Sequence, residues 1–330
     1  LDIKTNILPN ADALFLTAID PYGHELWRWT FPVNKLNQQT EQLSPLSSRP
    51  AYTETENELT VKANKRAFIF SKKDGQLKGV SVDNRKINFA NGPRFIGARR
   101  ADRSLDQFYN HDDEKAKEKD RTYSEFPDAA VFTKLDVKED GGNLVVTANY
   151  KLGNLDKAQW TINPSGELAL DYTYNFSGVV DLMGIRFDYP EDQVISKRWL
   201  GAGPYRVWQN RIHGTQYDVW ENDYNDPIPG ETFTYPEFKG YFGDVSWMNI
   251  QTKEGTISLT NETPDAYIGV YQPRDGRDRL LYTLPESGIS VLNVIPPVRN
   301  KVNSTDLCGP SSQPKWVNGP QTGRVIFRFM

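Results

Sequence analysis

The chain has 330 residues, of which 38% are hydrophobic and 25% are charged, a composition typical of a globular protein with a sizeable core. The formal net charge of −4 gives no electrostatic reason to expect nucleic acid or an anionic membrane as a partner. No apolar run is long enough to span a bilayer, and a single cysteine, Cys308, excludes an internal disulfide.

The N-terminal residues predict a β-hairpin. Two strands, Ala13–Ile19 and Glu25–Phe31, are separated by the turn residues Asp20–Gly23. Residues 35–57 are rich in Gln, Ser, Pro, Thr and Glu, and they predict a linker. Because a single hairpin is only marginally stable, we expect residues 1–34 either to pack on the main domain or to be the last strands of an upstream domain.

Residues 58–330 predict a single large β domain. Helical periodicity is nearly absent, whereas large apolar and smaller or polar residues alternate over Glu167–Phe176, as in a strand with one buried face. The similar runs are Leu59–Ala63, Ala67–Ser71, Leu144–Tyr150, Ala158–Ile162, Val245–Gln251, Thr256–Thr260, Ile289–Ile295 and Arg324–Phe329. Many strands separated by turns predict an all-β fold, and we expect a large two-sheet antiparallel sandwich.

No motif assigns a metal, a cofactor or a catalytic group. None of the three histidines has metal-ligand spacing, and phosphate-binding loops, dinucleotide fingerprints and G-x-S-x-G elbows are missing from the sequence. A catalytic carboxylate pair cannot be chosen among 43 acidic residues. Glu221, Asp223 and Asp226 could offer oxygen ligands to calcium, but their spacing does not match an EF-hand and favours a solvated acidic loop.

Residues 199–247 combine aromatic and polar side chains more densely than any other segment. An aromatic face can stack on a sugar ring, and arginine, histidine and carboxylate groups can hydrogen-bond its hydroxyls, so this segment predicts carbohydrate contact. The predicted carbohydrate-binding residues, including two arginines of the preceding 93–102 segment, are Arg99, Arg100, Trp199, Trp208, Arg211, His213, Trp220, Glu221 and Glu237. We expect them to form one shallow depression; the alternative is that the aromatic residues fill the core.

Several short motifs occur in the order found in one enzyme family. They are Trp199–Arg211 (WLGAGPYRVWQNR), Tyr235–Gly240 (YPEFKG) and Asp244–Trp247 (DVSW). Together with Phe68–Gly79, they resemble the C-terminal, small-chain domain of the family 2 β-galactosidases. The N-terminal hairpin resembles the last hairpin of the immunoglobulin-like domain that precedes it in such enzymes.

The resemblance implies a galactose-mutarotase-like supersandwich over residues 58–330, preceded by a linker at 35–57 and by terminal strands at 1–34. It also implies a C-terminal carbohydrate-associated domain of a glycoside hydrolase, which shapes a sugar-binding pocket. The family's catalytic TIM barrel has no counterpart in this chain, so we expect the chain alone not to be catalytic. The chain departs from the family at Arg206, where the family has Glu, and at Cys308, where some members have a sugar-site Trp.

Two other functions stay open at this point. One is a free-standing aldose mutarotase or epimerase, with His213 and Glu237 as the candidate acid and base. The other is a non-catalytic carbohydrate-binding or structural module. The expected partners are a carbohydrate and upstream domains of the same polypeptide, since the chain begins at Leu1 without a signal-peptide pattern. A periplasmic or secreted location is favoured if the chain belongs to a polysaccharide-degrading enzyme.

Overall fold

The computed structural model describes residues 11, 13–33, 48–100, 123–223, 240–270, 284–298 and 309–330. Within these ranges almost every regular element is a strand, and the strands pair antiparallel. The described helices are the two 3₁₀ turns η3 (Glu191–Gln193) and η6 (Pro310–Ser312). Among the described residues, no helix is long and apolar enough to cross a membrane.

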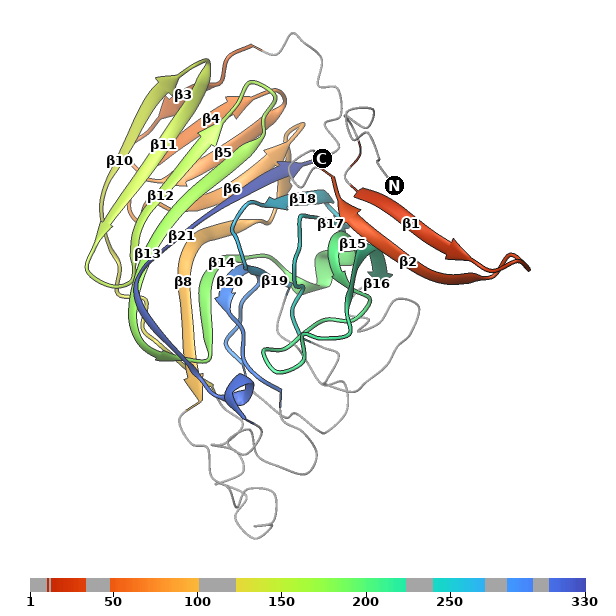
Figure 1. Ribbon diagram of the computed structural model, residues 1–330. Helices are drawn as coiled ribbons and strands as arrows, with labels where there is room; N and C mark the ends of the chain where they lie inside the picture. Colours follow the sequence, from red (N-terminus) through yellow and green to blue (C-terminus); the bar gives the residue numbers. More distant parts are fainter. Residues whose placement is uncertain are drawn as a thin grey trace.

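The described strands form two large sheets and a separate hairpin (Figure 1). The nine-stranded sheet has the order β10 (Val131–Asp140), β11 (Asn143–Lys151), β12 (Leu155–Ile162), β13 (Leu168–Val180), β21 (Lys315–Phe329), β18 (Gly255–Asn261), β17 (Trp247–Thr252), β15 (Val194–Gly203) and β16 (Gln216–Asp223).

The ten-stranded sheet has the order β19 (Tyr267–Val270), β20 (Ile289–Val294), β14 (Leu182–Asp188), β8 (Ala90–Arg100), β6 (Leu77–Val82), β5 (Arg66–Ser71), β4 (Glu58–Ala63) and β3 (Ala51–Glu54). Two short strands complete it, β7 (Arg85–Ile87) beside β6 and β9 (Tyr123–Glu125) beside β8. Figure 1 shows β10–β13 and β21 as one layer, with β3–β6 and β8 as the layer behind it.

The main core fills the space between the two sheets. Phe89 stacks on Phe187 of β14 at a ring-centroid distance of 4.8 Å and contacts Phe327 of β21 at 5.0 Å. All three side chains are fully buried, and burying each ring stabilises the fold by about 1.5–3 kcal/mol. These contacts join the sheets and confirm the predicted all-β, two-sheet antiparallel sandwich.

A second apolar cluster covers part of the outer face of the ten-stranded sheet. Its members come from strands of that sheet and from connecting segments: Ile96, Ala98, Tyr123, Leu182, Val207, Trp208, Tyr241, Leu284, Leu292, Ile295 and Val298. Over this region β8 and β14 are therefore covered on both faces. That double burial explains why neither strand shows apolar–polar alternation.

The hairpin consists of β1 (Ala13–Ile19) and β2 (Glu25–Pro32) and projects from the body near β16 (Figure 1). Its described link to the sandwich is the contact of β2 with β16, where Arg28 Nη1 lies 3.7 Å from Asp218 Oδ2. Farther along the chain, the last part of the segment with linker composition forms the edge strand β3, at residues 51–54.

Gly201 and Gly203 both lie in β15, and neither has the positive φ angle for which glycine is often needed. The structure gives a different reason for glycine at these positions. A Cβ on Gly201 would lie 3.0 Å from the Gly243 carbonyl oxygen, and one on Gly203 would lie 2.4 Å from the Trp220 ring. The missing side chains allow neighbouring groups to approach β15 closely.

Candidate functional site

The outer face of the ten-stranded sheet changes from apolar to polar along β8 and β14. Ile96 and Ala98 on β8 belong to the second apolar cluster. Toward the start of β8 the same face carries Arg94, which lies opposite Arg186 of the neighbouring strand β14. Alternation along the strands keeps these residues on one face. The exposed polar end of this face is where a ligand can reach the sheet.

A pocket of about 590 Å³ opens at this polar end. Its lining comes from the start of β8, the end of β14, the segment before β20, and β6 and β7: Lys78, Lys86, Asn88, Ala90, Asn91, Asp188, Tyr189, Pro190, Glu191, Glu286, Ser287 and Gly288. The lining includes two lysines and three carboxylates together with amide and hydroxyl groups. Such a mixture suits a neutral polar ligand better than a strongly charged one.

Hydrogen bonds hold the polar groups of the pocket in place. The Asn91 amide donates to Asp188 Oδ2 at 2.9 Å, and its Oδ1 accepts from Lys78 Nζ at 3.3 Å. Arg94 forms an ion pair with Asp188, and its Nε donates to the Asn91 carbonyl oxygen at 2.8 Å. The opposite charges and the amide between them therefore form a connected network before any ligand is present.

Lys78 also holds a carboxylate at the edge of this network. Its Nζ lies 2.8 Å from Asp74 Oδ2. Burial by itself would raise the pKa of Asp74, but hydrogen bonds from Lys78, the Gln76 backbone and Ser71 lower it below its ordinary value. Asp74 is therefore ionised at neutral pH, and it fixes the position of the Lys78 ammonium group.

The local sequence around Asn91 places the network. Asn91 has a φ of 51°, a left-handed conformation that asparagine tolerates better than most residues. The next residue, Gly92, faces the core, where an added Cβ would lie 2.2 Å from the Phe187 ring. Asn91-Gly92 therefore suits this backbone path, which aims the Asn91 side chain toward Asp188.

Glu254 braces the pocket from the other sheet. It lies in the turn between β17 and β18, and its Oε2 accepts hydrogen bonds from the Asn88 backbone N–H and the Tyr189 hydroxyl, both at 3.0 Å. Burial raises the pKa of Tyr189, and the adjacent Glu254 carboxylate raises it further. Tyr189 therefore stays protonated and acts as a hydrogen-bond donor at neutral pH.

Arg186 supports the opposite wall. Its Nη2 lies 2.6 Å from Glu125 Oε1, and its Nη1 donates to the carbonyl oxygen of Glu286, a lining residue. Burial lowers the pKa of this guanidinium group, although the Glu125 carboxylate partly compensates. Through these two contacts, Arg186 links β9 to the segment that precedes β20.

The three tryptophans predicted to bind carbohydrate all pack in or against a hydrophobic core. Trp199 is fully buried in the main core, 4.9 Å from the Phe242 ring centroid, and Trp208 is buried in the second cluster, 5.7 Å from Tyr241. Trp220 is half-buried and packs against the main core, and its Nε1 donates to the Gln216 carbonyl oxygen at 3.2 Å.

The predicted arginines of β8 and the predicted acid Glu221 belong to different sheets. Arg99 is exposed, whereas its neighbour Arg100 is buried beside the second cluster, where its backbone N–H donates to the buried Asp181 at 3.0 Å. Glu221 is exposed and lies 4.0 Å from Arg198 on the nine-stranded sheet. Glu237 lies outside the described residues.

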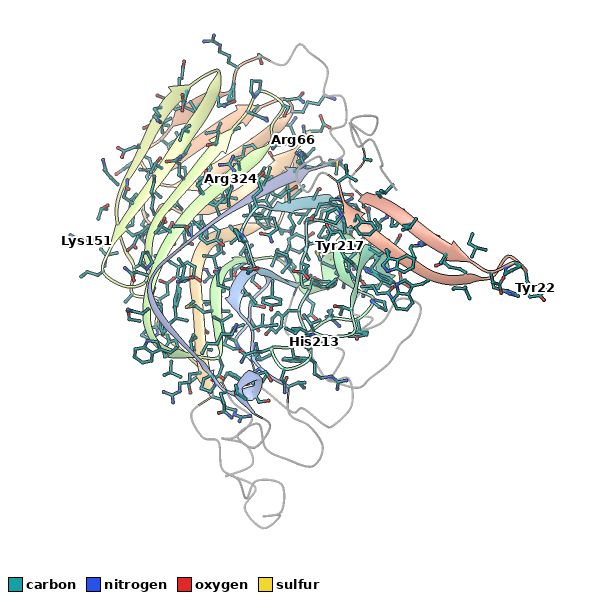
Figure 2. All side chains as sticks on the ribbon, in the orientation of Figure 1. Tyr22, Arg66, Lys151, His213, Tyr217 and Arg324 are labelled. Carbon is teal, nitrogen blue, oxygen red and sulfur yellow. The ribbon has the colours of Figure 1, made fainter. Side chains whose placement is uncertain are left out.

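Arg211 and His213 are exposed on the connection between β15 and β16, where Figure 2 labels His213. The His213 carbonyl oxygen accepts a hydrogen bond from the Tyr205 hydroxyl at 3.2 Å. The described members of the predicted set are thus spread over two cores, two sheets and one loop. Sugar binding by these residues stays a prediction.

Of the two departures from the family pattern, one lies in the described part of the chain. Arg206 is buried, with its guanidinium carbon 5.9 Å from the Phe242 ring centroid, and Cys308 lies outside the described residues. Within the described ranges, no three His, Cys, Asp or Glu side chains are grouped as metal ligands would be.

Sequence reasoning missed the pocket residues Lys78, Asn91 and Asp188. The available signal was weak: Asn91-Gly92 begins a strand with a residue that tolerates positive φ, and Asp188 ends an apolar strand with a carboxylate. Nothing in the sequence indicates that strands β6, β8 and β14 are neighbours, and that adjacency creates the pocket.

The comparisons with known proteins give one family and several solved structures. Among the solved structures are galactose 1-epimerase from Lactobacillus acidophilus NCFM, with 8% identity over 86% of this chain and 99% of that chain at a TM-score of 0.46, and an aldose epimerase homologue from C. elegans, with 8% identity over 85% and 99% at a TM-score of 0.38. These TM-scores are too low to support a statement about activity. No curated protein sequence matches.

The family match covers most of the sandwich. The model of the β-galactosidase small chain matches residues 62–296, from within β4 to just beyond β20, and so includes most strands of both sheets and every strand that lines the pocket. The chain belongs to the β-galactosidase small-chain family.

Proposed function

We propose that this chain is the carbohydrate-associated domain of a β-galactosidase-like glycoside hydrolase and that its pocket binds a sugar. The observation that carries the proposal is the polar network of Lys78, Asn91, Asp188 and Arg94 in a chain of the β-galactosidase small-chain family. A sugar hydroxyl both donates and accepts hydrogen bonds. Lysine and amide donors beside carboxylate acceptors therefore match a pair of neighbouring hydroxyls.

The pocket supports binding rather than hydrolysis. Lys78, Asn91 and Asp188 are held by one another, and the Asp188 carboxylate already accepts from both Asn91 and Arg94. A general acid or nucleophile must be free to reach the substrate, whereas these side chains are already engaged with one another. We infer that this chain orients a sugar and that the bond-breaking carboxylates are supplied by another domain.

Titration calorimetry with galactose, methyl β-galactoside and lactose tests the binding step. Millimolar affinity corresponds to only about 4 kcal/mol, so each sugar is titrated well beyond the millimolar range. Asp188→Asn removes a charged acceptor worth about 1.5–3 kcal/mol, and we expect it to weaken binding at least tenfold. Asp136→Asn, at an exposed carboxylate on the edge strand β10, is the matched control. Equal affinity of the Asp188 variant and the wild type contradicts the proposal.

We also infer that the hairpin joins this domain to an upstream β domain of the same polypeptide. Cross-strand pairing puts one row of apolar residues on a single face of the hairpin: Leu14, Leu16, Ala18, Trp27, Trp29 and Phe31. Arg28, on the other face, points to Asp218 of the sandwich, so the apolar face is directed away from it. Four of its large side chains, Leu16, Trp27, Trp29 and Phe31, are exposed in this chain, as expected of a face that another sheet covers in the longer polypeptide.

Hydrogen–deuterium exchange can test this connection. In the longer polypeptide that carries the upstream domains, amides of Leu14–Phe31 should exchange more slowly than in this chain alone, because pairing and burial protect them. Amides of the exposed edge strand β10 should exchange equally in both and serve as the internal control. Equal exchange of the hairpin in the two proteins contradicts the inference, and protection that depends on the concentration of this chain alone identifies a second copy as the partner.

A further inference from the structure

The outer face of the nine-stranded sheet carries a polar row along its longest strand pair. β13 and β21 pair over thirteen consecutive positions without a register shift, so their outward residues form one continuous ladder. We call it the β13–β21 row; its members are Trp316, Asn318, Ser177, Asn175, Thr322, Thr173, Asp171 and Arg324. The alternate residues Val317 and Phe327 face the main core, which fixes the outward direction of the row.

One end of the row is an exposed aromatic platform. The Trp316 side chain is 72% exposed, although tryptophan usually buries most of its surface. Beside it, Ser177 Oγ and Asn318 Oδ1 are hydrogen-bonded at 2.8 Å, so a hydroxyl and an amide stand next to the ring. An exposed indole flanked by short hydrogen-bonding side chains can stack on a sugar ring and bind its hydroxyls.

The other end is a pocket of about 390 Å³. Its lining is Lys157, Asp171, Tyr172, Thr173, Glu262, Pro264, Thr322, Gly323 and Arg324. Arg324, labelled in Figure 2, is held by Asp171 Oδ2 at 2.6 Å and Glu262 Oε2 at 3.0 Å. The two cations and two carboxylates of the lining balance in formal charge, which favours a neutral ligand over a charged one.

The length of the β13–β21 row favours an oligosaccharide over a single sugar as its ligand. Trp316 and Arg324 are eight residues apart on one strand, which corresponds to up to roughly 26 Å. Between them Thr173 and Thr322 form a cross-strand pair that offers further hydroxyls. A ligand that uses both ends must therefore be an extended chain of several units.

We propose that the β13–β21 row is a second carbohydrate site, which binds a neutral, extended oligosaccharide or polysaccharide. Trp316 stacks on one sugar unit, and the pocket around Arg324 receives another. This site lies on the other sheet from the pocket at Asp188, and it is inferred independently of the function proposed there. Its role is to hold a polymer on the surface of the domain.

Affinity electrophoresis of the whole chain tests this site. The probes are β-1,4-galactan, xyloglucan and hydroxyethylcellulose, with polygalacturonate as an anionic comparison. We expect at least one neutral polymer to retard the wild-type chain, and Trp316→Ala to weaken that binding about tenfold through loss of the stacking partner. Tyr22→Ala, which removes an exposed aromatic side chain from the turn of the hairpin, is the control and should leave retardation unchanged.

Three results overturn the inference: no retardation by any neutral polymer, retardation by polygalacturonate alone, or retardation that Trp316→Ala leaves unchanged. Because the Trp316 side chain is so exposed, its removal should not unfold the chain, and an unchanged thermal transition of the variant checks this. Asp188→Asn, run beside it, reports on the pocket of the ten-stranded sheet. The two variants therefore test the two proposed sites independently of each other.

Discussion

Replacing Glu254 with alanine should destabilise the sandwich at the pocket where its two sheets meet. The Glu254 carboxylate accepts hydrogen bonds from the Asn88 backbone and from the hydroxyl of Tyr189, whose side chain is buried. The Asn88 side-chain amide also donates to this carboxylate, so an alanine leaves three donors without that acceptor. A buried donor that loses its partner costs about 1–3 kcal/mol, and Asn88 lies at the low end because the pocket admits water. We therefore expect the free energy of unfolding to fall by about 3 kcal/mol.

Urea unfolding at neutral pH, followed by tryptophan fluorescence, measures this change through the midpoint and slope of the transition. Glu254→Gln keeps one accepting oxygen and should lose only about 1 kcal/mol. Glu139→Ala, at an exposed glutamate on the edge strand β10, should stay within about 0.5 kcal/mol of the wild type. If Glu254→Ala also stays within that range, the carboxylate does not brace the two sheets and the reasoning is refuted.

Two further predictions concern Tyr172 and Gly92. Burial raises the pKa of Tyr172 to about 12, so the unfolded chain ionises first and the free energy of unfolding falls by roughly 1.4 kcal/mol per pH unit between about pH 10 and 12. Tyr172→Phe should make that decline shallower while changing neutral-pH stability little, because the hydroxyl only reaches Thr263 at 3.5 Å; an unchanged alkaline slope in urea titrations contradicts this. Gly92→Ala should destabilise the fold by about 1–3 kcal/mol, because its Cβ would lie 2.2 Å from Phe187. Gly79→Ala, whose Cβ would meet only Ile69 at 4.0 Å, should be nearly neutral, and equal melting temperatures of the two variants would argue against a steric effect at Gly92.

Strands with one exposed face could be predicted from the sequence. In β13, Leu168 and Leu170 face the core while Asp171 faces outward, and this alternation made the strand visible. Strand β8 was missed because both faces are covered there, so that Phe95 and Ile96 are equally buried. A strand between two apolar clusters loses the period of two on which such a prediction depends.

The candidate site could not be predicted in the same way. Trp199 and Trp208 have the residue type and the polar neighbours of a sugar platform, but each packs in a core against another aromatic ring. Composition does not distinguish these environments, since both favour aromatic side chains. Lys78 and Asp188 are brought into one pocket by strand adjacency, which local sequence does not encode.

The central claim is that the polar pocket of the ten-stranded sheet binds a sugar. Backbone amide shifts of the isotopically labelled chain, followed by NMR during titration with methyl β-galactoside, test it most directly. The account predicts saturable shifts that concentrate at residues 78, 86–91, 188–191 and 286–288. Shifts confined to the exposed loop that carries Arg211 and His213, or no saturable shift at all, would contradict it.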